Sequence, residues 1–219
     1  MTRQEILAVA KPILFNTDMV RAILEGRKTV TRRAVKNGSR TPAGIGRDKF
    51  YTYVDALNGK PFNGAGFYKD SDIFCVDGVR YTDAEYFKTP FIPGDLLYVR
   101  ETWQKQFGIY WYKATPTCGN ATPPKKWRPS IHMPKEAARI FLRVTDVKAE
   151  RLQEMRAQDA WNEGARCSCM SPVPDCAGNK DAFIRIWNST TKPADLELYG
   201  WNANPWVWVY GFEKVEVTP

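Results

Sequence analysis

The chain has 219 residues, enough for one substantial domain or for one domain with a large insertion. Its net charge is +8 and 13% of its residues are aromatic, so nucleic acids, nucleotides or other anions are plausible partners, although positive charge also serves solubility. No apolar run approaches the roughly 18 residues of a membrane-spanning helix, and we expect no membrane partner. The five cysteines form an odd set that fits reduced thiols, so we expect a cytoplasmic protein.

The N-terminal part of the chain is predicted to form a strand, a helix and a second strand. Apolar residues recur at helical spacing in the helix, with Asn16 or Thr17 as its N-cap. Gly26 then supplies a natural helix stop. The strands are expected at residues 12–15 and 31–35, and the helix at residues 17–25.

The composition changes between residues 36 and 93, where Gly, Asn, Asp, Lys and Tyr are common and apolar runs are short. This segment is predicted to be a large central insertion without a hydrophobic core of its own. Short strands are expected within it at residues 51–54, 66–68, 73–76 and 79–81, and Asp77–Gly78 is expected to turn between the last two.

Regular elements return after the insertion. Residues 96–103 are predicted to form one strand, with residues 109–113 as its hairpin partner and residues 115–129 as a loop. Further strands are expected at residues 139–147 and 205–217, and helices at residues 158–164 and 180–188. The last strand alternates, with Trp206, Trp208 and Tyr210 on one face and Val207 and Val209 on the other. This order of elements predicts an α+β fold built on a small mixed barrel or a curved sheet.

Cations cluster where the first predicted helix meets the second strand. Arg27 and Lys28 follow Gly26 directly, and Arg32 and Arg33 follow two threonines of the strand. Cations are favoured at a helix C-terminus, and side chains at such a junction can converge on a ligand. Composition alone is equally compatible with a solvated basic turn that caps the helix.

Several segments of the chain together resemble a known domain superfamily. They are residues 23–33, 93–103, 129–134, 139–152, 159–164 and 204–209. In these segments the chain resembles the ASCH domains, which have a PUA-like fold, a small β-barrel flanked by helices. The layout is most similar to the ASCH proteins of phages and prophages. The resemblance implies a single ASCH domain over residues 1–219, with an insertion at about 36–93 and a cysteine-containing loop at about 166–179.

One branch of this superfamily, the small YqfB-type amidohydrolases, cleaves the acyl amide of N4-acetylcytidine and related N4-acylcytosines. Its Lys-Thr-x-Thr motif matches residues 28–31, and its Ala-x-x-Glu stretch matches residues 160–163. The resemblance therefore implies Lys28, Thr31 and Glu163 as a catalytic set that needs no cofactor and no metal. The branch is about half as long as this chain and lacks the insertion.

Amide hydrolysis needs a nucleophile, a base and stabilisation of the tetrahedral oxyanion. Thr31 can serve as the nucleophile if Lys28 takes its proton, which requires a lowered lysine pKa. Burial and the neighbouring arginines would lower that pKa, whereas Glu163 would raise it, so the sequence leaves the balance open. Alternatively, Lys28 and Thr31 position a water for Glu163 as base, or Lys28 and Glu163 form only a structural ion pair.

Other residues are expected to contact the substrate. Arg27, Arg32 and Arg33 belong to the basic junction, while Glu101 could line the mouth of the barrel and His132 could bind substrate or phosphate. Each of the last two has a plainer interpretation: Glu101 as a strand carboxylate with satisfied hydrogen bonds, and His132 as a loop residue bonded to the backbone.

One segment that contains several cysteines resembles a metal-binding loop. It holds Cys167, Cys169 and Cys176, and Cys118 could supply a fourth ligand. The usual zinc spacing is Cys-x-x-Cys, not Cys-x-Cys, so we expect no metal here.

The sequence thus predicts an amidohydrolase that removes the acyl group from N4-acetylcytidine or a related N4-acylcytosine base or nucleoside. The partner is then a small-molecule nucleoside or modified cytosine. A non-catalytic RNA-binding module and a ribonuclease are the alternatives, and RNA is the partner in both. An RNA binder would need an open basic track, for which the candidates are Arg27, Arg32, Arg33, Lys125, Lys126 and Arg128.

Overall fold

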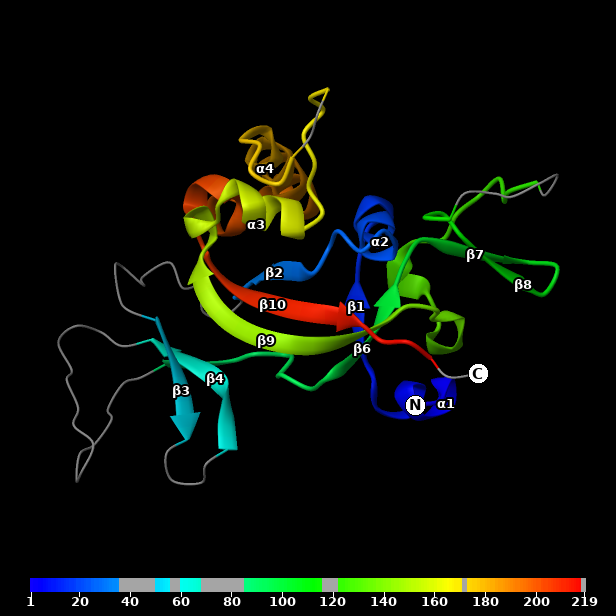
Figure 1. Cartoon of the computed structure of the whole chain (residues 1–219), viewed down its shortest axis with the longest axis horizontal. Helices are drawn as coiled ribbons and strands as arrows, with labels where there is room; N and C mark the ends of the chain where they lie inside the picture. Colours follow the sequence, from blue (N-terminus) through cyan, green and yellow to red (C-terminus); the bar gives the residue numbers. More distant parts are fainter. Residues whose placement is uncertain (36–49, 56–59, 68–84, 116–121, 171–172, 218–219) are drawn as a thin grey trace.

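The computed structural model describes residues 1–35, 50–55, 60–67, 85–115, 122–170 and 173–217, and its arrangement is shown in Figure 1. Its mixture of helices and sheets confirms the predicted α+β class. The main sheet has five strands in the order β1-β6-β9-β10-β2. These strands are β1 (Lys11–Leu14), β2 (Val30–Ala34), β6 (Leu96–Arg100), β9 (Phe141–Arg151) and β10 (Trp206–Lys214).

The remaining elements are short or peripheral. A three-stranded sheet contains β3 (Phe50–Asp55), β4 (Lys60–Phe67) and β5 (Glu85–Lys88), and a hairpin contains β7 (Trp103–Gln106) and β8 (Ile109–Tyr112). The α-helices are α1 (Arg3–Val9), α2 (Thr17–Leu24), α3 (Ala157–Asn162), α4 (Gly178–Thr190) and α5 (Leu196–Tyr199). Short 3-10 helices lie at Ser130–His132, Lys135–Ala137, Leu152–Glu154, Pro193–Asp195 and Trp201–Ala203. No helix in these ranges is long and apolar enough to cross a membrane.

The main sheet is curved but open. Strands β9 and β10 form its long antiparallel centre, and Figure 1 shows them bending together. β1 runs parallel to β6, and β2 runs antiparallel to β10, so β1 and β2 are the two ends of the strand order. Within the described residues these two strands do not pair, so the expected closed barrel is not formed there. A side chain links the two edges instead, since Arg33 Nη2 donates to the Leu14 carbonyl at 2.7 Å.

Helix α2 forms as the sequence predicts, and the basic segment that follows it leads into strand β2 of the main sheet. The Asn16 side chain caps it by accepting from the Met19 N–H at 2.8 Å. Gly26 follows the helix at φ +73°, a left-handed conformation that suits glycine. The backbone N–H of Lys28 then donates to the Ala22 carbonyl at 3.0 Å, so the helix end holds Lys28 in place.

The predicted alternation of the last strand is confirmed. Trp208 and Tyr210 of β10 pack in a core cluster with residues of α2, β1, β6 and β9. Val207 and Val209 pack on the opposite face with Phe183 of α4 and with residues around α3. The sheet therefore has an apolar layer on each side, and α3 and α4 cover one of them (Figure 1).

One predicted strand needs correction, and one helix had no counterpart in the prediction. The strand expected over residues 96–103 is broken, because β6 ends at Arg100 and β7 begins at Trp103. Trp103 exchanges backbone hydrogen bonds with Arg128, at 3.1 and 2.8 Å, and so leaves the main sheet. Helix α1 was not predicted, although Thr2 and Glu5 form a capping box that marks its start.

The outcome for the insertion is mixed. Strand β3 contains the strand expected at residues 51–54. Strand β4 begins earlier than the strand expected at residues 66–68 and contains its first two residues, while residue 68 lies outside the described residues. The strands expected at residues 73–76 and 79–81, with their turn at Asp77–Gly78, lie outside the described residues. Near the end of the segment, Phe91 joins the main core cluster, and the Thr89 hydroxyl is hydrogen-bonded to the Tyr210 hydroxyl at 2.8 Å.

Gly164 packs α3 closely against α2 and generates a test of the fold. It follows α3 at φ +86°, and an added Cβ would lie 2.7 Å from the Ala22 Cβ. We expect Gly164→Ala to lower the free energy of unfolding by about 2–4 kcal/mol, because the left-handed conformation and the overlap each cost energy. Gly94→Ala is the matched control, since Gly94 has φ +91° but open space around it, and should cost only about 1 kcal/mol. Urea denaturation measures both, and equal losses would contradict this close packing.

Candidate functional site

A cleft of about 910 Å³ lies between the two open edges of the main sheet and reaches α4. Its lining combines charged or polar side chains with aromatic ones. The polar group includes Lys28, Thr31, Arg32, Arg33, Arg100 and Glu163. The aromatic group includes Phe15, Phe91, Phe183 and Trp187. Segments distant in sequence therefore meet at a single concave surface, as binding sites require.

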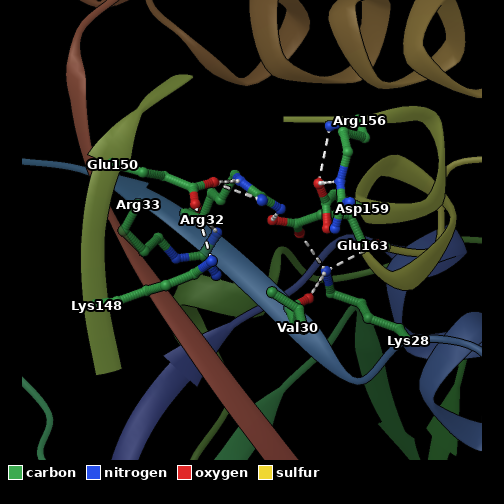
Figure 2. A network of polar contacts seen from close by, with 9 residues as sticks. All are labelled: Lys28, Val30, Arg32, Arg33, Lys148, Glu150, Arg156, Asp159 and Glu163. Atoms are coloured by element: carbon green, nitrogen blue, oxygen red, sulfur yellow. Dashed lines mark hydrogen bonds and ion pairs between the residues drawn. The ribbon is translucent and has the colours of Figure 1, made fainter. Parts of the chain in front are cut away.

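Lys28 is buried at the wall of this cleft and fully hydrogen-bonded. Its Nζ donates to the Val30 carbonyl at 2.8 Å, to the Glu163 carbonyl at 2.7 Å and to Glu163 Oε2 at 2.7 Å (Figure 2). The Lys28 side chain is 1% exposed and the Glu163 side chain 5% exposed. An ammonium group has three protons, and each has an acceptor here, which is what makes its burial tolerable.

The pKa of Lys28 is lowered from 10.5 to about 8. Burial is the largest cause, and Arg33 and Arg32 act in the same direction, while the charge and hydrogen bond of Glu163 oppose it. Of the opposing influences on the Lys28 pKa that the sequence left open, desolvation is therefore the stronger. A lysine with this pKa is partly neutral in mildly alkaline solution and can then accept a proton.

Glu163 shares its carboxylate between two cations. Its Oε2 accepts from Lys28, and its Oε1 accepts from Arg32 Nη1 at 3.3 Å. Arg32 also donates through Nε and Nη2 to Glu150 Oε1, at 2.8 and 2.6 Å, and Glu150 Oε2 pairs with Lys148 at 3.0 Å. Figure 2 shows this row of alternating charges from the buried lysine to the partly exposed Lys148. Both Glu163 oxygens are engaged, so this residue is suited to orient Lys28 rather than to act as a free base.

Thr31 lies in β2 opposite Tyr210 of β10, and it is buried at the cleft wall. Residues alternate across a strand, so Thr31 and Arg33 share one face of β2 and Arg32 lies on the other. Among the hydrogen bonds of the described residues, none involves the Thr31 hydroxyl. This hydroxyl therefore lies at the cleft wall without a competing partner in that part of the chain.

Arg33 and Lys28 flank the Phe15 ring. The Arg33 Cζ lies 5.2 Å from the ring centroid and the Lys28 Nζ lies 5.3 Å from it, distances at which cation–π attraction operates. Phe15 directly follows β1, whereas both cations belong to the segment around β2. The ring and the two cations thus form a contact across the open side of the sheet.

The other predicted substrate-binding residues lie away from the cleft lining. Arg27 is partly buried, pairs with Glu25 at 2.6 Å and donates to the Gly164 carbonyl at 3.3 Å. Glu101 is buried in a two-point ion pair with Arg139, at 2.8 and 2.9 Å. His132 is exposed in a 3-10 helix. The structure brings together Lys28, Thr31, Glu163, Arg32 and Arg33, and it leaves Arg27, Glu101 and His132 outside the cleft wall.

The sequence alone did not indicate some residues of the site. Phe15 and Glu150 had no motif around them, and only the tertiary fold brings Glu150 to Arg32. The end of α4 lines the cleft with Thr190 and Thr191, which a helix prediction ending at residue 188 did not single out. An aromatic residue at the end of a predicted strand is a local signal that could have suggested Phe15. Glu150 has no such signal, because its strand β9 is separated from β2 by β10.

One group of side chains in the described ranges could hold a metal ion. It consists of Cys167, Cys169 and Cys176 in the loop between α3 and α4. None of these cysteines lines the cleft, so the cleft and this loop are separate features of the molecule.

The shared carboxylate of Glu163 provides a second test. We expect Glu163→Ala to lower the free energy of unfolding by about 3–5 kcal/mol, because Lys28 and Arg32 stay buried after losing a partner. Glu163→Gln, which keeps the shape and one acceptor oxygen, should be less harmful. Glu25→Ala is the control, because Glu25 is exposed and its ion pair with Arg27 should contribute less than about 1 kcal/mol. Urea denaturation at neutral pH measures all three, and similar losses for Glu163→Ala and the control would contradict the buried network.

Comparisons with known proteins identify no relative of this chain. No protein-family model matches it, and neither a curated protein nor a solved structure matches it at a significant level.

Proposed function

We propose that this protein is an amidohydrolase that removes the acyl group from N4-acetylcytidine or a related N4-acylcytosine base or nucleoside. One observation carries the proposal: the lysine, threonine and glutamate implied by the ASCH resemblance converge on a single cleft. Lys28 Nζ and Glu163 Oε2 are 2.7 Å apart although 135 positions separate them in the chain, and Thr31 lines the same cleft. A chance motif match would not require this convergence.

The proposal includes membership of the ASCH superfamily and a PUA-like architecture. The curved five-stranded sheet with flanking helices supports it. The sheet edges are not paired in the described residues, but the Arg33 side chain joins them at Leu14. In this interpretation the open side of the sheet is where the substrate enters.

In the proposed reaction, the Thr31 hydroxyl oxygen attacks the acyl carbonyl carbon, and neutral Lys28 takes the hydroxyl proton. The tetrahedral intermediate then expels the exocyclic amine, to which Lys28 returns the proton, and an acyl ester on Thr31 remains. Lys28 then takes a proton from a water molecule, whose oxygen attacks the ester carbonyl carbon. The bond to the Thr31 oxygen breaks, Lys28 returns the proton to that oxygen, and a carboxylic acid and the free threonine are released. The lowered pKa of Lys28 supports this role, because a general base works best near the operating pH.

The rest of the cleft suits a small aromatic substrate. Its aromatic side chains offer flat apolar surfaces against which a cytosine ring can stack. The guanidinium groups of Arg33 and Arg100 supply only donors, which match the acceptor atoms of cytosine and a developing oxyanion. Glu163 holds Lys28 in position and takes no proton itself in this scheme.

The RNA-binding alternative has weaker support from the contacts. Lys125, Lys126 and Arg128 are exposed as that interpretation requires. Arg32, however, is buried and donates to Glu150 and Glu163, so it is not an open cation on a surface track. Phosphate binding draws mainly on accessible lysine and arginine, and this favours a small-molecule ligand.

Two threonines of the Lys-Thr-x-Thr motif provide a matched test. We expect the wild-type protein to release cytidine from N4-acetylcytidine, and Thr31→Val to reduce kcat by about 10³-fold or more, because the nucleophile is lost. Thr29→Val should retain activity, since Thr29 is exposed and does not line the cleft. Chromatography of the products measures both rates, and circular dichroism checks folding. Equal activity in the two variants would exclude Thr31 as the nucleophile.

The pH dependence tests the role of Lys28. Below its pKa of about 8 only the neutral fraction can accept a proton, so kcat/KM should rise about tenfold per pH unit and level off at higher pH. A flat or falling profile would rule out Lys28 as the base. If no N4-acyl substrate is turned over, salt-dependent binding of RNA would support the RNA-binding module, and shortened RNA products would support a ribonuclease.

A further inference from the structure

The loop between α3 and α4 brings three cysteine sulfur atoms together. The Cys176 Sγ lies 3.3 Å from that of Cys167 and 3.7 Å from that of Cys169. The sulfur atoms of Cys167 and Cys169 are close enough for a disulfide, which would leave Cys176 as a free thiol. All three sulfur atoms lie within 4.8 Å of one another. The sequence brings in the third cysteine from seven positions further along, so the chain has to turn back to complete the group.

A buried amide fixes this turn. The Asn179 Oδ1 accepts from the Cys167 N–H at 3.0 Å, and its Nδ2 donates to the carbonyls of Val173 and Pro174 at 2.8 and 3.0 Å. The Asn179 N–H also donates to the Cys176 carbonyl at 2.9 Å. Asn179 is completely buried, so these bonds are shielded from water. The two halves of the loop are thus tied to the same side chain, and the convergence of the sulfur atoms is part of the folded structure.

We propose that the reduced chain binds one zinc ion through Cys167, Cys169 and Cys176. With zinc–sulfur bonds of about 2.3 Å in a tetrahedral arrangement, neighbouring sulfur atoms lie about 3.8 Å apart. The distances from Cys176 to its two partners, 3.3 and 3.7 Å, are close to that separation. A disulfide would use two of the three sulfur atoms, whereas a soft divalent cation uses all of them. The unusual spacing of the three cysteines led us to expect no metal, whereas the fold brings their sulfur atoms together.

Charge and access also suit a thiolate site. Three thiolates and one Zn²⁺ ion have a net charge of −1, and the loop leads directly into α4, whose N-terminal end favours negative charge. Three protein ligands leave the fourth tetrahedral position for water or a small solute. Cys169 is exposed, so solvent reaches the group. Cys118, named above as a potential fourth ligand, lies outside the described residues.

The zinc ion would join two elements that build the cleft. The loop begins just after Glu163, which belongs to the charge network, and ends at α4, whose Phe183 and Trp187 line the cleft. The cysteines themselves do not line it, so the metal would support the arrangement of α3 and α4 without taking part in chemistry there. This inference stands apart from the proposed amidohydrolase activity, and either can fail alone.

The test uses full-length protein prepared with reductant and zinc and then freed of loosely bound metal. Elemental analysis should find one zinc ion per chain in the wild-type protein. Cys167→Ser, Cys169→Ser and Cys176→Ser should each lose it. Ser168→Ala, a change between two of the proposed ligands, should keep it. Replacement of zinc by Co²⁺ should produce the charge-transfer and visible absorption bands of tetrahedral cobalt–thiolate coordination.

A second measurement keeps the proposal falsifiable if a serine variant fails to fold. Thiol alkylation of the wild-type protein, followed by peptide mass analysis, should show these three cysteines protected by zinc and released by a chelator. The proposal is overturned if reduced wild-type protein holds no zinc, or if all three serine variants retain it. A Cys167–Cys169 disulfide that persists under reductant, with no metal bound, would also overturn it.

Discussion

The structure around the cleft depends on the buried carboxylate of Glu163. It joins the turn after α2, through Lys28, to strand β2, through Arg32, and its own backbone ends α3. Burying an isolated charge costs several kcal/mol, so none of these three groups tolerates the loss of its partners. The ion pairs of the proposed catalytic site therefore also hold these elements of the fold together. Changes made to alter activity here will alter stability as well.

In the part of the chain that the structure describes, the main sheet does not close, and its open side contains the cleft. β1 and β2 stand at opposite ends of the strand order, and the cleft lies between them. Paired strands would have filled this space with backbone hydrogen bonds. Arg33 spans the gap instead, by its bond to the Leu14 carbonyl and its contact with Phe15, so the edges stay together without a ladder. The two edge strands are thus joined by a side chain while the cleft between them stays open.

The sequence predicted the elements whose signals are local. Residues a few positions apart in the chain determine three features, and each was predicted: the N-cap at Asn16, the helix stop at Gly26 and the alternation of the last strand. The break after Arg100 was missed, because the hydrogen bonds that cause it come from Arg128, far along the chain. Motif matching brought Lys28, Thr31 and Glu163 together, yet the direction of the Lys28 pKa depended on burial, which a linear sequence does not display. Glu101 illustrates the same limit, since its partner Arg139 could only be assigned once the fold was known.

Because of the close packing at Gly164, the position of the Glu163 carboxylate also depends on residues that have no polar side chain. Gly164 follows Glu163 directly, and the Ala22 methyl group occupies the place that a side chain at position 164 would need. Larger residues at position 22 would push α3 outwards and move the Glu163 carboxylate away from Lys28. Positions 22 and 164 are thus expected to evolve as a pair of small residues. A random-mutagenesis screen for activity would register position 22 as essential although its side chain offers no group for binding or catalysis.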